Sequence, residues 1–227
     1  PGKTPSENIQ FLVFLMAVIK AVDEYADLLR ISVASAGNDH RLGANEAPPA
    51  VVSIFLGDEL TEVLKSIEND TYFTSHGAVQ MDIGAIVLPH FVKDNTDRNR
   101  TSPFAFTGNK FEFRMLGSAA SVANPNIVLN TAVAEALDQF AKELDGVAPE
   151  DMEHAVHELI KRAIKKHKRV IFNGNGYTDE WIEEAEKRGL YNLKSTPDAL
   201  PMWIAQKNID LFTKHSIFTS EELHSRY

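Results

Sequence analysis

The 227-residue sequence contains no cysteine, and its lysines and arginines are outnumbered by aspartates and glutamates, 23 against 32. Without cysteine, disulfide bridges and thiolate-bound metals are excluded, which fits a reducing compartment. The resulting net charge of −9 disfavours wholesale binding to nucleic acid or to an anionic membrane surface. We therefore expect neither a nucleic-acid partner nor a membrane partner.

Long hydrophobic runs are also missing. The longest is FLVFLMAVI at residues 11–19, well short of the roughly 20 residues that span a bilayer. It lacks the basic segment and cleavage site of a secretory leader. We predict that it is part of a buried helix and that the protein is cytoplasmic.

The two ends of the sequence suggest that it is part of a longer protein. It opens with PGKTP and no initiator methionine, and it closes with TSEELHSRY. In that last stretch Thr219 is a candidate helix cap and Glu222 stands at the capping-box position. We expect a helix to begin there and to continue.

The order of the predicted elements is mixed, without a regular alternation of strand and helix. Helices are predicted up to about residue 30, at 58–70, at 178–188 and at 196–213. Two more are predicted to begin at Pro125, with Asn124 as cap, and after residue 148. Strands are predicted at 50–56, at 84–92 with Pro89 limiting the second to an edge, and at 110–116. This order predicts an α+β fold, with a curved antiparallel sheet backed by long helices and a helical C-terminal extension.

The stretch KFEFR at residues 110–114 carries the most chemical information. Side chains alternate along a strand, so Lys110, Glu112 and Arg114 share one face while Phe111 and Phe113 share the other. A carboxylate between two cations suits a site that holds a divalent cation beside an anionic substrate. The solvated face of an amphipathic strand would show the same pattern.

Two loops carry further candidates. The segment DRNR places Arg98 and Arg100 two residues apart, and arginine favours bidentate phosphate contacts, although an ordinary surface loop explains the pair as well. The segment NDHRLGANEAPPA at residues 38–50 carries Arg41 and Glu46. Such a loop can bind a carboxylate and deprotonate a second reactant, or it can simply connect two elements.

Three other stretches are weaker candidates. NGNG at residues 173–176 lacks the spacing and the lysine of a phosphate loop and is typical of a turn. His154 and His157 stand three apart on a predicted helix, but the sequence offers no clear third ligand. The basic run KRAIKKHKR ends a predicted helix, where cations complement the helix dipole.

In order, these pieces resemble the catalytic domain of glutamine synthetase. That family has an Arg…Glu-Ala-Pro flap, an Asn-Arg-Ser element, a [RK]-x-E-x-R strand and an Ala-Asn-Pro helix start. The corresponding residues here are Arg41…Glu46-Ala47-Pro48, Asn99-Arg100-Thr101, Lys110 to Arg114, and Ala123-Asn124-Pro125. The amino-acid sequences of residues 32–50 and 99–114, which carry these motifs, are most similar to those of the large type III enzymes.

The resemblance implies a role for each matching residue. Arg41 would hold the substrate glutamate, and Glu46 would close the site and take part in ammonium deprotonation. Arg100 and Lys110 would contact ATP phosphates. Glu112 would bind one of the paired Mg²⁺ or Mn²⁺ ions, and Arg114 would stabilise the transferring phosphoryl group.

The sequence also departs from the family pattern. The spacing from Arg41 to Glu46 is one residue shorter than in the bacterial type I pattern. Ala105 stands where type I carries another phosphate-binding arginine. About 40 extra residues between the flap and Arg100 predict an insertion at about 57–95. We assign residues 1–145 to the C-terminal part of the catalytic domain and 146–227 to a truncated helical extension.

The implied reaction is ATP-dependent ligation of ammonia to glutamate through γ-glutamyl phosphate, in a homo-oligomeric ring. The family's other metal ligands would precede the first residue, so we expect this segment alone to be inactive. Two alternatives remain open. One is a related ligase that joins glutamate to another amine, and the other is a non-catalytic homologue serving assembly or regulation.

Overall fold

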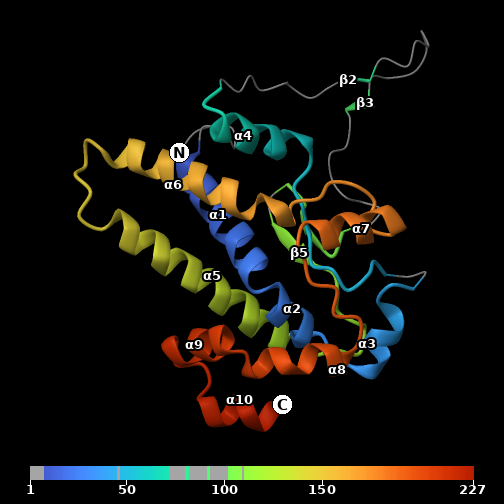
Figure 1. Ribbon diagram of the computed structural model, residues 1–227. Helices are drawn as coiled ribbons and strands as arrows, with labels where there is room; N and C mark the ends of the chain where they lie inside the picture. Colours follow the sequence, from blue (N-terminus) through green and yellow to red (C-terminus); the bar gives the residue numbers. More distant parts are fainter. Residues whose placement is uncertain (1–7, 45–46, 72–79, 82–90, 93–101, 109) are drawn as a thin grey trace.

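The computed structural model describes residues 8–44, 47–71, 80–81, 91–92, 102–108 and 110–227 (Figure 1). The helices up to residue 144 are α1 Ile9–Glu24, α2 Ala26–Ser32, α3 Ala36–Arg41, α4 Asp58–Glu68 and α5 Ala123–Leu144. The strands are β1 Ile54–Phe55, β2 Gln80–Met81, β3 Phe91–Val92, β4 Phe104–Phe106 and β5 Phe111–Phe113. The C-terminal helices are α6 Met152–His167, η2 Lys168–Val170, α7 Asp179–Lys187, α8 Thr196–Ala199, η3 Leu200–Ile204, α9 Gln206–Lys214 and α10 Ser220–Arg226.

Helix α1 is the centre of the structure. The side chain of Asn8 caps it by accepting a hydrogen bond from the Phe11 amide, at 3.0 Å. The helix contacts both α5 and α6 and lies between them in Figure 1. The prediction of a buried helix at residues 11–19 is confirmed, because most of its side chains are inaccessible. The predicted single helix to residue 30 is interrupted at Tyr25, after which α2 continues the chain.

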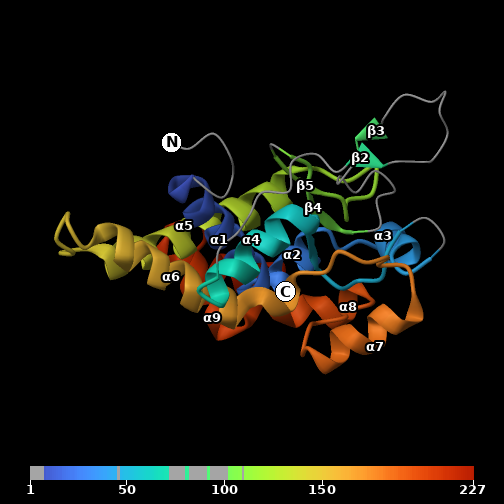
Figure 2. The same cartoon turned by 90° about the horizontal axis from the view of Figure 1, so that it is seen from above.

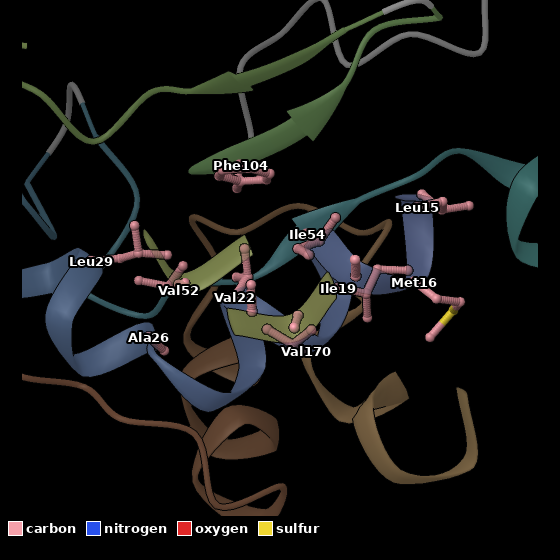
Figure 3. Packing of buried hydrophobic residues seen from close by; sticks show 14 of the residues in the cluster. Leu15, Met16, Ile19, Val22, Ala26, Leu29, Val52, Ile54, Phe104 and Val170 are labelled. Carbon is pink, nitrogen blue, oxygen red and sulfur yellow. The ribbon is translucent and has the colours of Figure 1, made fainter. Parts of the chain in front are cut away.

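A single hydrophobic cluster joins α1 to the strands and to the C-terminal helices. Figure 3 shows Leu15 and Ile19 of α1 packed together with Ile54, Phe104 and Val170 from three other elements. The same cluster includes buried residues of α9, η3 and α10: Leu211, Phe212, Trp203 and Leu223. The core therefore contains residues from both sides of position 145, and the division of the chain at that position stays a prediction.

The main sheet has three strands in the order β1-β4-β5. β1 pairs with β4 in parallel, and β4 pairs with β5 antiparallel. The prediction of an antiparallel sheet is therefore wrong in part, since the sheet is mixed. β1 is also shorter than the predicted strand at 50–56, because residues 50–53 form no strand pairs. β2 and β3 pair separately, and residues 84–90 of the predicted third strand lie outside the described residues.

Two helix starts in the C-terminal half are confirmed, and two other helix predictions are wrong. Thr178 caps α7, and Thr219 forms a capping box with Glu222 at the start of α10. The predicted helix at 196–213 is instead divided into α8, η3 and α9. Pro201 cannot donate a backbone hydrogen bond, which favours this break. α5 begins at Ala123, so Asn124 lies within its first turn instead of capping it, and Pro125 is the third residue of the helix instead of the first.

Two buried aspartates tie the first helices to the C-terminal half. Asp23 lies 2.7 Å from both His167 Nδ1 and Arg169 Nε. Asp27 is fully buried and accepts hydrogen bonds from Asn208 Nδ2 and Lys207 Nζ, at 3.1 and 2.9 Å. Buried carboxylates are tolerated only when they are paired. None of the helices in the described part of the chain is long and apolar enough to cross a membrane.

A third buried charge positions α3, the short helix that ends at Arg41. The guanidinium of Arg30 is 1% exposed; its Nη2 bonds to Asp39 at 2.6 Å and its Nε to the Leu193 carbonyl at 2.6 Å. The Thr196 amide donates to the other oxygen of Asp39, at 2.6 Å. Burial tends to raise the pKa of Asp39, but the hydrogen bonds from Arg30 and Thr196 outweigh it and lower that pKa.

The packing of Phe104 predicts a large effect of its removal. Phe104→Ala should reduce the free energy of unfolding by about 3–5 kcal/mol, because the ring is fully buried and leaves a cavity. Phe14→Ala is the matched control, since Phe14 is 48% exposed, and should change stability by less than about 1 kcal/mol. Urea unfolding of both variants measures the difference, and equal effects would contradict the assigned core.

The pairing of Asp39 predicts a pH-dependent loss of stability. Asp39→Asn should lower the free energy of unfolding at pH 7 by about 3 kcal/mol, because Arg30 is left buried without its counter-ion. The wild-type carboxylate has a lowered pKa in the folded state. Its contribution is therefore complete above its unfolded pKa of about 3.9 and is lost as the pH falls through the folded value.

Unfolding curves of wild type and Asp39→Asn between pH 7 and pH 2.5 should consequently converge at the acid end. The exposed Asp145→Asn is the control and should follow the wild type throughout. A stability gap between wild type and Asp39→Asn that is the same at pH 7 and pH 2.5 would show that the charge is not responsible.

Candidate active site

Strand β5 separates an aromatic face from a charged face, as its alternation predicts. The rings of Phe111 and Phe113 pack against Phe104 of β4, with centroids 5.4 and 5.8 Å apart. Phe111 also contacts Phe106 at 5.2 Å. These contacts seat the hairpin on the core, so Glu112 is presented on the opposite face with its side chain 37% exposed.

The charged face brings its three predicted residues together. Lys110 Nζ lies 3.3 Å from Glu112 Oε1. Arg114 donates from Nη2 and Nε to Glu112 Oε2, at 3.0 and 3.1 Å. These hydrogen bonds, from Arg114 first and Lys110 second, lower the pKa of Glu112. Glu112 is thus a carboxylate at neutral pH, with one oxygen facing each cation.

Arg41 reaches the end of the same strand from α3. Its Nη2 donates to the Met115 carbonyl at 2.7 Å, and its Nε donates to Asn38 Oδ1 at 3.0 Å. A guanidinium has five N–H groups, so three remain beyond these two bonds. The bond to Met115 places Arg41 beside the residue that follows Arg114, although the two arginines are far apart in the sequence.

Asn38 is the residue that the sequence alone does not identify. It is 3% exposed, and its Nδ2 donates to the carbonyls of Val33 and Met115, at 2.7 and 2.9 Å. Its Oδ1 accepts from Arg41, so one amide joins the end of α2, the exit of β5 and the arginine. Ser35 caps α3, and a Ser followed by Ala-Gly-Asn is a sequence signal for this short helix.

The remainder of the predicted flap is only partly described. The Gly43 amide donates to the Pro48 carbonyl at 3.0 Å, and Leu42 forms a bridge with Ala47. Gly43 has φ +78°, a conformation that glycine adopts readily. The two ends of the loop are therefore close together. Glu46 and Arg100 lie outside the described residues, and their assigned roles stay predictions.

The weaker candidates have structural partners. Asn173 of NGNG accepts from the amides of Leu56 and Gly57, at 3.0 and 3.1 Å, so it stabilises the start of α4. His157 lies 3.4 Å from Asp70, and with Glu158 the two could hold a metal ion; His154 is not in this group. However, the ammonium of Lys161 already pairs with Asp70 and lies 4.0 Å from Glu158. That ammonium supplies the positive charge there.

Comparison with known proteins identifies the family. The sequence pattern of the glutamine synthetase C-terminal domain matches residues 155–227. The whole chain aligns with glutamine synthetase from Butyrivibrio fibrisolvens at 57% identity and with type-3 glutamine synthetase from Dictyostelium discoideum at 53%. It covers 32% and 31% of those proteins, so it spans about a third of the length of the curated relatives it matches. Glutamine synthetase from Bacteroides fragilis is 41% identical, again over the whole chain. These matches along the entire sequence show that the chain belongs to the glutamine synthetase family.

Proposed function

We propose that this chain forms part of the active site of a type III glutamine synthetase, which ligates ammonia to L-glutamate at the expense of ATP. The observation that supports the proposal is the convergence of four charged side chains at the end of β5. Lys110, Glu112 and Arg114 share one face of the strand, and Arg41 binds the carbonyl of the next residue. Two cations paired with one carboxylate, and a third bound to the backbone just after the strand, suit a site for anionic reactants.

The reaction has two steps. The γ-carboxylate of glutamate attacks the γ-phosphorus of ATP, which forms γ-glutamyl phosphate and releases ADP. Ammonia then attacks the acyl carbon, the C–O bond to phosphate breaks, and glutamine and inorganic phosphate are formed. Ammonium must lose a proton before it attacks, and Glu46 is the proposed base.

The chain's cations would serve the first step. Phosphoryl transfer depends on positioning and on charge stabilisation more than on covalent chemistry from the protein. Arg114, with its fork fixed by Glu112, is the proposed partner of the transferring phosphoryl group. Lys110 and Arg100 are proposed to contact ATP phosphates. The three remaining N–H groups of Arg41 can hold a carboxylate of glutamate in a bidentate contact.

A divalent cation fits one residue of this set. Glu112 is an ionised carboxylate on an accessible face, and hard oxygen ligands suit Mg²⁺ and Mn²⁺. Such an ion would neutralise charge on the phosphates. One carboxylate does not complete an octahedral shell, so the remaining ligands would come from other parts of the full-length protein and from water. We propose that the full-length protein works as a homo-oligomeric ring.

Substitution of Glu112 tests the metal role. In the full-length protein, Glu112→Gln keeps the shape of the side chain but removes its charge, so the affinity for Mg²⁺ should fall at least about tenfold. The measurement is glutamine formation as a function of metal concentration. Glu186→Gln on the exposed side of α7 is the control and should leave the curve unchanged. A wild-type metal dependence in Glu112→Gln would refute the assignment.

Substitution of Arg41 tests the glutamate contact. Arg41→Lys in the full-length protein keeps the charge but loses the planar fork, so KM for glutamate should rise about tenfold or more, with a smaller change in kcat. Arg162→Lys, an exposed arginine on α6, controls for the exchange itself. If KM for ATP rises and KM for glutamate does not, Arg41 binds the nucleotide instead.

The two alternative functions are separated by simple assays. A glutamate–amine ligase would turn over small amines faster than ammonium. A non-catalytic homologue would not bind ATP in the presence of Mg²⁺. Lys110 and Glu112 on the charged face of β5 stay accessible, with side chains 65% and 37% exposed, which favours a catalytic protein over a purely structural one.

A further inference from the structure

A basic pocket lies away from the candidate active site. It has a volume of about 410 Å³ and opens between α4, the end of α6, η2 and the end of α7. Figure 2 shows α4 beside α6, which it contacts. None of the site residues proposed above lines it. Ligand pockets in proteins have volumes of about 300–1,000 Å³, so this one can enclose a small molecule.

The lining of the pocket combines an apolar floor with a surplus of positive charge. Leu64, Ile164 and Ile171 supply the apolar surface. The one acidic residue of the lining is Glu68. The cations of the lining are Lys65, Lys165, Lys166, Lys168, Arg169 and Arg188. This concentration of cations is unexpected in a chain of net charge −9.

Four of these cations are neutralised by neighbouring carboxylates. The ion pairs are Lys168–Glu68 at 2.6 Å, Arg169–Asp23 at 2.7 Å, Lys166–Glu24 at 3.3 Å and Arg188–Glu184 at 2.8 Å. The two arginines also donate to backbone carbonyls, which fixes their orientation. These four residues therefore shape the pocket without leaving a net charge in it.

Lys65 and Lys165 supply the surplus. Both are exposed, they come from different helices, and neither forms an ion pair with any residue in the described part of the chain. Each stands in the last turn of its helix, where it can offset the helix dipole. That dipole amounts to about half a charge at each terminus. The two helix dipoles therefore offset about half of the positive charge of the two lysines. They give no reason for both lysines to border one apolar pocket.

We propose that this pocket binds a small organic dianion with an apolar body. Lys65 and Lys165 would contact the anionic group, and Leu64, Ile164 and Ile171 would contact the body. A phosphate monoester, which carries a charge of −1.5 to −2 at neutral pH, and an aromatic dicarboxylate share this chemistry. The site is separate from the ligation reaction and does not depend on the function proposed above.

Calorimetric titration of the 227-residue chain at low ionic strength tests the site with four probes. Phenyl phosphate and phthalate are the dianions with an apolar body, inorganic phosphate lacks the body, and benzyl alcohol lacks the charge. At least one of the first two should bind about fivefold or more tighter than inorganic phosphate, and benzyl alcohol should not saturate. The dianion that binds identifies the anionic group that the site prefers.

Paired double variants separate this pocket from general surface charge. Lys65→Gln with Lys165→Gln should weaken binding of the preferred dianion about tenfold or more. Lys187→Gln with Lys194→Gln removes the same charge from exposed positions that do not line the pocket, and it should change the affinity less than about twofold. Circular dichroism checks that both variants are folded. Equal losses in the two variants, tighter binding of inorganic phosphate, or no saturable binding of either dianion would overturn the proposal.

Discussion

The structure depends on the neutralisation of charges buried in its first helices. Asp23 and Asp27 lie where α1 and α2 are covered by other elements, and each is paired by side chains of the C-terminal half. A carboxylate left unpaired in such a place would cost several kcal/mol. The packing of α1 and α2 therefore requires η2 and α9 to be in place, and η2 and α9 in turn pack against these two helices. A boundary near residue 145 can divide the chain by motif content, but the two sides share one core.

The same dependence extends to the candidate active site. Arg30 is buried beneath α3 and holds Asp39, which is also held by the Thr196 amide. Asp39 precedes Arg41 by two residues, so the contacts that neutralise a core arginine also fix the helix that carries Arg41. Asn38 then joins this helix to the exit of β5. The C-terminal region thus supports the site without contributing a side chain to it.

Local features of the fold could be predicted from the sequence because they depend on neighbouring residues. The alternation of KFEFR gives the two faces of β5, and the hydroxyls of Thr178 and Thr219 cap the helices that they precede. Pro201 carried a signal for the division of the helix at 196–213, and the prediction overlooked it. The interruption at Tyr25 has no comparable signal, because no proline or glycine stands near it in the sequence.

Features that join distant segments could not be predicted in this way. The parallel pairing of β1 with β4 joins residues 50 apart, and alternation does not specify a partner. Neither the amide of Asn38 nor the carbonyl of Met115 has a sequence pattern that points to the other. Strand alternation singled out Lys110, Glu112 and Arg114 as candidates, the charged loop supplied Arg41, and the family resemblance then assigned their roles. Only the structure shows that the last three form ion pairs and that Arg41 is anchored beside them.

The pairing of β4 with β5 has a consequence for how this site can fail. Phe104 lies opposite Phe113, Ala105 opposite Glu112, and Phe106 opposite Phe111. A shift of β5 by one residue would turn Glu112 into the core and both phenylalanines into solvent. Because side chains alternate along a strand, the Glu112 carboxylate can face only the core or the solvent, and the aromatic contacts favour the solvent. The contacts of these rings with Phe104 and Phe106 therefore decide which way the Glu112 carboxylate faces.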